Sequence, residues 1–333
     1  MITAWLRRAI LAAAGTDEED PLLRPGGGPG SYASSLPFRL AGPGQDPREI
    51  AKALAARLLA EPESEPDIAT ATATGPGYLT VTVTHDTLAG LAVRVAEAGE
   101  ACATSDALRG RTVPAPPAAD LAAAPDWPQA RAALAAELTA RLATAAGATP
   151  IYSPERPLVP PSSLPPSASQ AGPVAAAVLY AGYDAVRFAL ARTAPGGEVP
   201  EAATIARHML TNPAYAVRYA HAAAAAVLRW AASLGTRPAE FQPRLLTRPE
   251  ELALLDALSW LPERVAMAAR RGRPDEFAGY LEELAARTLD TMSTSGFTNV
   301  SAISSERLWL AAAARTGLAA SLGLLGIGAP ERL

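Results

Sequence analysis

The chain has 333 residues, of which 49% are hydrophobic and 19% are charged, so most of it is expected to fold, as two domains or as one large one. One cysteine and three histidines exclude a disulfide framework and a cysteine-based zinc site. The net charge of −4 excludes the strongly basic body of an indiscriminate nucleic-acid binder. The long uncharged stretches are rich in Ala and Pro, which excludes a membrane span, and Arg7 and Arg8 interrupt the apolar run that a signal peptide needs. We therefore expect a cytoplasmic protein.

The first 110 residues predict a small α+β domain. A helix is expected over Ile2–Ala14, a strand over Ser31–Leu40, and a second helix after Asp46, which can cap it. Alternation of apolar and polar residues around Gly75-Pro76-Gly77 predicts a β-hairpin, and Thr87–Ala98 predicts a closing helix. The glycine-rich run 26–30 does not open a helix after a strand, so a flexible connector is favoured over a phosphate-binding loop.

The composition changes over residues 111–172, which are rich in Pro and Ala. We expect a semi-extended linker here, with one helix over Trp127–Ala146.

The remainder, 173–333, predicts an all-α helix bundle. Apolar residues recur three or four apart in seven segments, namely 174–193, 200–210, 213–234, 249–261, 263–271, 274–292 and 305–325. Glycines stand where several of these helices should end and prolines where they should begin.

The sequence offers no pattern typical of catalysis. The histidines His85, His208 and His221 have no spacing that suits metal ligation, and the single lysine, Lys52, is not part of a phosphate-binding motif. Acidic pairs fall on faces expected to be solvated. We therefore expect a binding protein with no metal and no cofactor rather than an enzyme.

The segment Asn212–His221 is the most informative. With Asn212 as cap and Pro213 in the first turn, Tyr215, Tyr219 and Trp230 fall within a sector of roughly 60°, and two arginines, Arg218 and Arg229, lie to one side. Rings that stack unpaired bases beside guanidinium groups are what a single-stranded RNA loop requires. The alternative is that the two tyrosines form a second packed face of a buried helix.

This segment, NPAYAVRYAH, resembles the "NPxYYVQYAH" signature at the start of the anticodon-binding domain of class I arginyl-tRNA synthetases. Gly182–Leu190 is similar to the "GxDAxRYxLL" segment of that family, and Gly323–Leu333 is similar to its terminal "LGLLGISAPERM". In the first domain, Asp46–Ala51 and Gly75–Val83 resemble the "NPREIA" and "GPGFINFxL" motifs of the family's N-terminal additional domain, which contacts the tRNA elbow.

The resemblance divides the chain into an N-terminal additional domain over 1–110, a linker over 111–172, and a DALR-type anticodon-binding domain over 173–333. It implies tRNA, of the arginine type, as the partner. The tRNA-binding residues that it implies together with the helix pattern are Asn212, Tyr215, Arg218, Tyr219, His221, Arg229 and Trp230.

Members of this family carry a nucleotide-binding catalytic domain between those two parts. Residues 111–170 contain no histidine and no lysine and are too few for a doubly wound domain. The resemblance therefore implies a non-catalytic, arginyl-tRNA-synthetase-like protein that binds tRNA. The alternative is a protein-interaction module that has lost the RNA surface and associates, for example, with the full-length synthetase.

Overall fold

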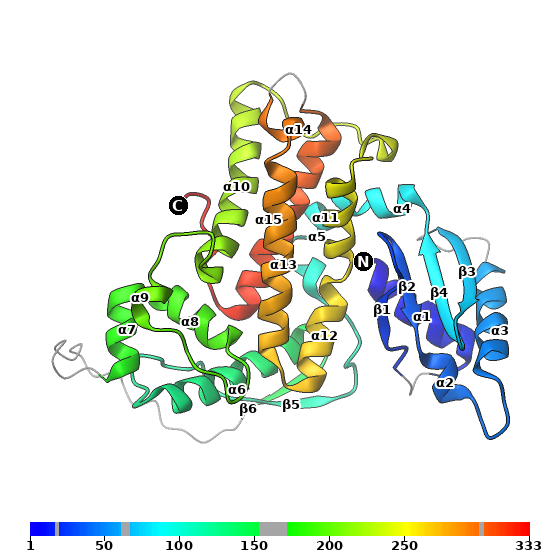
Figure 1. Ribbon diagram of the computed structural model, residues 1–333, viewed down its shortest axis with the longest axis horizontal. Helices are drawn as coiled ribbons and strands as arrows, with labels where there is room; N and C mark the ends of the chain where they lie inside the picture. The colour runs from blue at the N-terminus through cyan, green and yellow to red at the C-terminus, as the bar shows by residue number, and fades with distance from the viewer. Residues whose placement is uncertain (17–19, 61–66, 153–171, 300–302) are drawn as a thin grey trace.

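The computed structural model describes residues 1–16, 20–60, 67–152, 172–299 and 303–333. A small sheet domain lies beside a larger helical body (Figure 1).

The sheet domain is formed by the first 83 residues. Its four strands, β1 (Leu23–Pro25), β2 (Ser31–Ser34), β3 (Ile68–Thr74) and β4 (Tyr78–Val83), are antiparallel in the order β1-β2-β4-β3. Three helices, α1 (Ile2–Ala14), α2 (Leu36–Leu40) and α3 (Pro47–Leu59), complete the domain. Helix α3 lies along β3 and β4, and its N-cap Asp46 accepts a hydrogen bond from the Arg48 amide. The predicted antiparallel sheet with helices is confirmed.

Two details of this domain differ from the sequence prediction. The strand expected over Ser31–Leu40 ends at Ser34, because Pro37 stands in the first turn of α2, where its fixed φ favours a helix. Strand β1 has no counterpart in the sequence prediction, since three residues are too few for a readable alternation.

The helical body contains the remaining elements. Residues 84–152 form α4 (His85–Ala89), α5 (Leu91–Ala98), the 3₁₀ helix η1 (Gly99–Ala103), β5 (Thr112–Ala115), α6 (Trp127–Ala145) and β6 (Thr149–Tyr152). Residues 172–245 form α7 (Pro173–Ala181), α8 (Tyr183–Arg192), α9 (Ala202–Ile205), α10 (Pro213–Ser233) and the 3₁₀ helix η2 (Pro243–Leu245). The last part forms α11 (Pro249–Ser259), α12 (Leu261–Arg271), α13 (Pro274–Met292), α14 (Ser295–Thr298) and α15 (Ser305–Leu325).

The predicted helix bundle is confirmed, with α13 and α15 near its centre (Figure 1). The two helices expected over 87–98 and 174–193 are each divided, at Gly90 and at Gly182. The helix expected over 200–210 is shortened to α9. Helix α15 is long and apolar enough to cross a membrane, but 61% of its apolar 18-residue stretch is buried inside the protein, as in the core helix of a bundle.

Helix α6 overturns part of the linker prediction. It packs against α8 and α12, and its Leu134, Leu138 and Leu142 are buried. The flanking strands β5 and β6 pair in parallel, so β5, α6 and β6 form one β-α-β unit. Residues 111–152 therefore belong to the helical body, because the alanines of α6 allow close packing that composition alone does not reveal. The remaining residues of the expected linker that precede 172 lie outside the described residues.

The sheet domain is joined to the helical body by a ring of charges. Arg7 of α1 pairs with Glu263 of α12 at 2.6 Å and with Asp20 at 2.9 Å, and Arg270 pairs with the same two carboxylates at 2.9 Å each. The Arg7 and Glu263 side chains are only 6% and 3% exposed. Burial alone would lower the pKa of Arg7, but the two carboxylates raise it. The four groups therefore satisfy one another across the domain boundary.

Neutral contacts continue this boundary toward α11. The Thr3 hydroxyl donates to the Ser259 carbonyl at 2.7 Å, and the Tyr32 hydroxyl donates to Ser259 Oγ at 2.8 Å. The rings of Tyr32 and Trp260 lie 5.2 Å apart. The two domains thus share one continuous core.

If α6 is part of that core, Leu138→Ala should lower the free energy of unfolding by about 2–5 kcal/mol, because it removes a fully buried side chain and leaves a cavity. Urea unfolding followed by circular dichroism measures this change. The control Leu59→Ala, at a leucine that is 52% exposed, should change the free energy of unfolding by no more than about 0.5 kcal/mol. Equal, small effects of both substitutions would show that α6 is not packed in the core and would favour the linker prediction.

Candidate tRNA interface

The first half of α10 presents an exposed row of stacked rings. The Tyr215 ring lies between His208 and Tyr219, with centroids 5.5 Å and 5.7 Å away and interplanar angles of 14° and 18°. Tyr219 is 39% exposed, and His208 is also exposed. We call His208, Tyr215 and Tyr219 the aromatic stack. Parallel, solvent-accessible rings are the arrangement on which unpaired bases stack.

The two tyrosines differ in their burial. Tyr219 is the exposed end of the stack and Tyr215 is half-buried. The core-facing residues of this helix are small, as at Ala220 and Ala224. The alternative of a second packed face therefore applies to Tyr215 in part and not to Tyr219.

A cavity of about 220 Å³ opens beside the stack. Tyr215, His208, Arg207 and Arg218 line it. The Arg218 Nε is buried and has no hydrogen-bond partner, and one guanidinium nitrogen lies 4.0 Å from Asp184. A donor left without a partner beside exposed rings is able to bind an acceptor that arrives with a ligand.

Three of the predicted residues are engaged within the protein. Asn212 is buried, where it caps α10 by accepting from the Ala214 amide and donates to the carbonyls of Ile205 and Arg207. His221 is 2% exposed, and its Nδ1 lies 2.8 Å from the Pro330 carbonyl. Arg229 donates to the Glu331 carbonyl at 2.7 Å and pairs with its carboxylate at 3.3 Å. These contacts fix the start of α10 and bind the C-terminal tail to it.

Trp230 lies on the same face of α10 as Tyr215 but far from it along the helix axis. Fifteen residues of helix separate the two positions, which at 1.5 Å a residue is about 22 Å along the axis. Of the three rings predicted to share one sector of the helix, only Tyr215 and Tyr219 therefore lie close together.

His208 is the site residue that the sequence reasoning missed. It precedes α10 in a segment that returns from α9, and only the chain reversal at 206–212 brings its ring onto Tyr215. No helical or strand period connects the two positions, so the sequence gives no signal for this contact.

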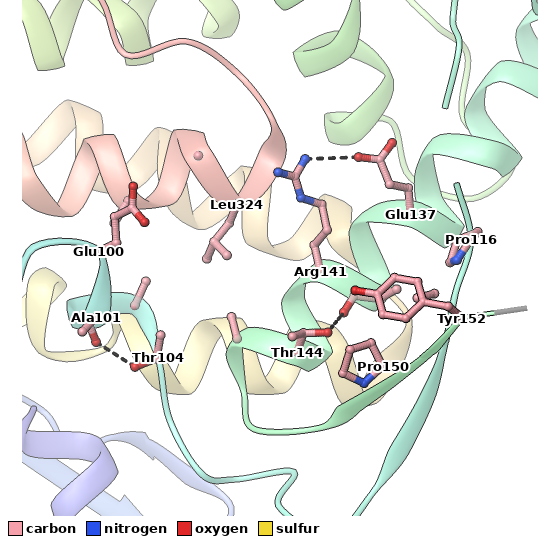
Figure 2. A pocket seen from close by; sticks show the side chains of 16 residues that line it. Glu100, Ala101, Thr104, Pro116, Glu137, Arg141, Thr144, Pro150, Tyr152 and Leu324 are labelled. Atoms are coloured by element: carbon pink, nitrogen blue, oxygen red, sulfur yellow. Dashed lines mark hydrogen bonds and ion pairs between the residues drawn. The ribbon is translucent and has the colours of Figure 1, made fainter. Parts of the chain in front are cut away.

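A larger cavity, of about 780 Å³, lies elsewhere, between η1, α6, β6 and α15 (Figure 2). Arg141 and Glu137 meet on one side of it, and Glu100 lies across from them (Figure 2). The Glu137 carboxylate is already satisfied, by Arg187, by Arg141 and by the Ala119 amide. Among the described residues that line this cavity there is no histidine, lysine, cysteine or serine.

Other reactive groups are also engaged or inert. The Cys102 thiol is fully buried, and burial raises its pKa to about 12. In the described part of the chain, no group of three or more His, Cys, Asp or Glu side chains is arranged to hold a metal ion. The stack on α10 is therefore the surface whose chemistry most clearly suits a ligand.

Two parts of the chain match known domain families. Residues 217–333 match the DALR anticodon binding domain, and residues 1–83 match the arginyl tRNA synthetase N terminal domain. The chain carries two domains of arginyl-tRNA synthetases. The predicted resemblance is thus confirmed, and it comprises the sheet domain and the part of the helical body from α10 onward.

Among curated relatives, the arginine–tRNA ligase of Clavibacter sepedonicus is 39% identical over 158 residues, which are 46% of this chain and 28% of that ligase. The ligase of Kineococcus radiotolerans is 38% identical over 159 residues, 46% of this chain and 29% of the ligase. The chain thus spans less than a third of the length of these relatives. The arginyl-tRNA synthetase structure from Thermus thermophilus covers 67% of this chain and 40% of its own, with 22% identity and a TM-score of 0.37, too low to support an argument about this fold.

The His221 contact predicts a pH dependence of stability. Burial lowers the pKa of His221 below its usual 6.5, although the Pro330 carbonyl partly opposes this. Below pH 6.5 the unfolded chain therefore takes up a proton that the folded protein does not, and stability falls until the pH reaches the folded-state pKa.

We expect the wild type to lose more unfolding free energy than His221→Gln between pH 7.5 and pH 5.5, in urea titrations at both pH values. Parallel losses in the two proteins would show that the buried ring does not govern this dependence.

Proposed function

We propose that this protein binds tRNA through the aromatic stack of its anticodon-binding domain and does not catalyse aminoacylation. The observation that carries the proposal is the parallel stack of His208, Tyr215 and Tyr219, whose two outer rings are exposed. Tyr219 lies within the DALR domain match, which begins at residue 217, and the other two rings lie just before it. The partner we propose is tRNA of the arginine type, and the compartment is the cytoplasm.

The charges around the stack suit a local contact rather than a broad phosphate surface. Arg207 and Arg218 border the cavity beside the rings, whereas Arg229 is held by Glu331. Since phosphate contacts give most of the affinity for nucleic acid, few free cations predict a modest salt dependence. Stacking then supplies a larger share of the binding free energy than in a basic RNA-binding domain.

The absence of catalysis is supported by what lies between the two matched domains. In the described part of residues 84–216, the only paired strands are β5 and β6, and helices α4 to α9 pack into or along the body. One β-α-β unit is far from the two halves that form a doubly wound nucleotide-binding sheet. Residues 111–170 also contain no histidine and no lysine that could stabilise charge on a transferring phosphorus centre.

A second candidate is a protein-interaction module, with the full-length synthetase as its partner. Exposed apolar side chains on α7 and before α10, namely Leu179, Tyr180, Met209 and Leu210, favour it. It differs from the first candidate in one observable, because it requires no affinity for RNA.

Binding to bulk tRNA, followed by fluorescence anisotropy at 50 and 200 mM salt, tests the proposal. We expect Tyr219→Ala to weaken binding by about 5- to 100-fold, since one stacked base contributes about 1–3 kcal/mol, with the salt slope unchanged. Arg207→Ala should weaken binding and lower the slope by about one contact.

Tyr180→Ala is the matched control, because Tyr180 is a 68% exposed tyrosine outside the stack. Its affinity should equal that of the wild type, and the same preparations should show no arginine-dependent exchange of pyrophosphate into ATP. Loss of affinity in Tyr180→Ala to the same extent would contradict the stack as the binding site. No affinity of the wild type for tRNA would favour the second candidate.

A further inference from the structure

A second cavity lies where the sheet domain meets the helical body. Its volume is about 260 Å³, just below the range of roughly 300–1,000 Å³ typical of sites for drug-sized ligands. The glycine-rich run Gly27-Gly28-Pro29 forms one wall, and residues of α11, α12 and α13 form the other. The run thus forms one edge of a cavity that is open to solvent.

The cavity has two charged ends, which we call its poles. The first pole is the guanidinium group of Arg264, which no described carboxylate pairs with. Arg264 lines the cavity, and its guanidinium lies over the rings of Trp260 and Tyr280, 5.7 Å and 5.9 Å from their centroids. Its Nε is buried and has no hydrogen-bond partner, and no described carboxylate pairs with it. The two rings hold the guanidinium in place, and its planar set of N–H donors matches a carboxylate.

The second pole is the carboxylate of Asp256, which pairs with no described Arg or Lys side chain. Asp256 accepts a hydrogen bond from the Gly30 amide at 2.9 Å, and no described Arg or Lys pairs with it. Burial raises its pKa, which the Gly30 amide only partly opposes. The nearby Trp260 indole N–H also lowers the pKa of Asp256. Trp260 is only 3% exposed, and its Nε1 has no hydrogen-bond partner among the described residues. The cavity thus holds one donor cluster and one acceptor, both incompletely satisfied.

The rest of the lining is close to neutral. Glu283 and Arg287 lie at the margin, 4.0 Å from each other on one face of α13. Pro25, Pro29 and Ala253 supply apolar surface. A phosphate would meet two carboxylates here, and the Gly30 amide that could bind it is already occupied by Asp256. A ligand that carries one negative and one positive group satisfies both poles at once.

We propose that this cavity binds a small zwitterion of the free α-amino acid class, with the ligand carboxylate on Arg264 and its ammonium group on Asp256. The side chain of the ligand lies against the prolines and Trp260. Because the glycine-rich run belongs to the sheet domain and both charged poles belong to the helical body, the ligand contacts both domains. Binding therefore stabilises their docking.

Thermal melting of the full chain with each of the twenty L-amino acids at 5 mM tests the proposal. We expect at least one amino acid to raise the melting temperature, since a ligand that binds only the folded state stabilises it. The N-acetyl and the carboxamide derivative of that amino acid, which each lack one charge, should bind at least tenfold more weakly in calorimetric titration.

Two variants test whether Arg264 and Asp256 bind the charged groups of the amino acid. Arg264→Met and Asp256→Asn should each lower the affinity for the amino acid at least tenfold, and Asp256→Asn retains an oxygen that can accept from Gly30. Arg271→Met is the matched control, because Arg271 lies on α12 outside the cavity and pairs with Glu276 on the surface. Its affinity should remain that of the wild type.

The proposal is overturned if no amino acid changes the melting temperature, or if both variants bind as well as the control. Folding of the variants is checked by circular dichroism. Should a variant fail to fold, the charge-deleted ligand derivatives decide the question on the wild type. The cavity contains none of the residues of the aromatic stack, so failure here leaves the tRNA proposal intact.

Discussion

The arrangement of this protein depends on the closed ring of Arg7, Glu263, Arg270 and Asp20 between α1 and α12. Removing charges from water costs several kcal/mol for each ion, so the ring contributes less to net stability than its short distances suggest. Its effect is on orientation, because any other placement of α1 leaves buried charges unpaired at a cost of about 3–5 kcal/mol. The ring therefore selects one docking of the sheet domain on the helical body.

This docking joins the two parts of the chain that match synthetase domains into one body. The apolar faces of α1 and β2 are covered by α11 and α12, as the contact of Tyr32 with Trp260 illustrates. Helix α10 lies on the side of the body away from the sheet domain (Figure 1). Its His221 contacts the C-terminal tail, and its Tyr219 is exposed to solvent. A rigid body of this kind presents the aromatic stack and the sheet domain at a fixed separation, which suits the proposed binding of one tRNA by both.

The sequence predicts the elements of the fold better than it predicts how they pack. Helices α3 and α10 begin at residues with clear local signals, the Asp46 and Asn212 caps, and α1 ends at the left-handed Gly15. The parallel pairing of β5 with β6 and the stack of His208 on Tyr215 join segments with no common period. Helix α6 was readable as a helix, but its burial depends on partners in α8 and α12 that local pattern does not identify.

Differential scanning calorimetry of the full chain tests most directly whether the two domains form one body. If the charge ring and the shared core couple them, the protein melts in a single transition whose calorimetric enthalpy equals its van't Hoff enthalpy. Two separable transitions, or a calorimetric enthalpy well above the van't Hoff value, would contradict the account, since the sheet domain would then unfold independently of the helical body.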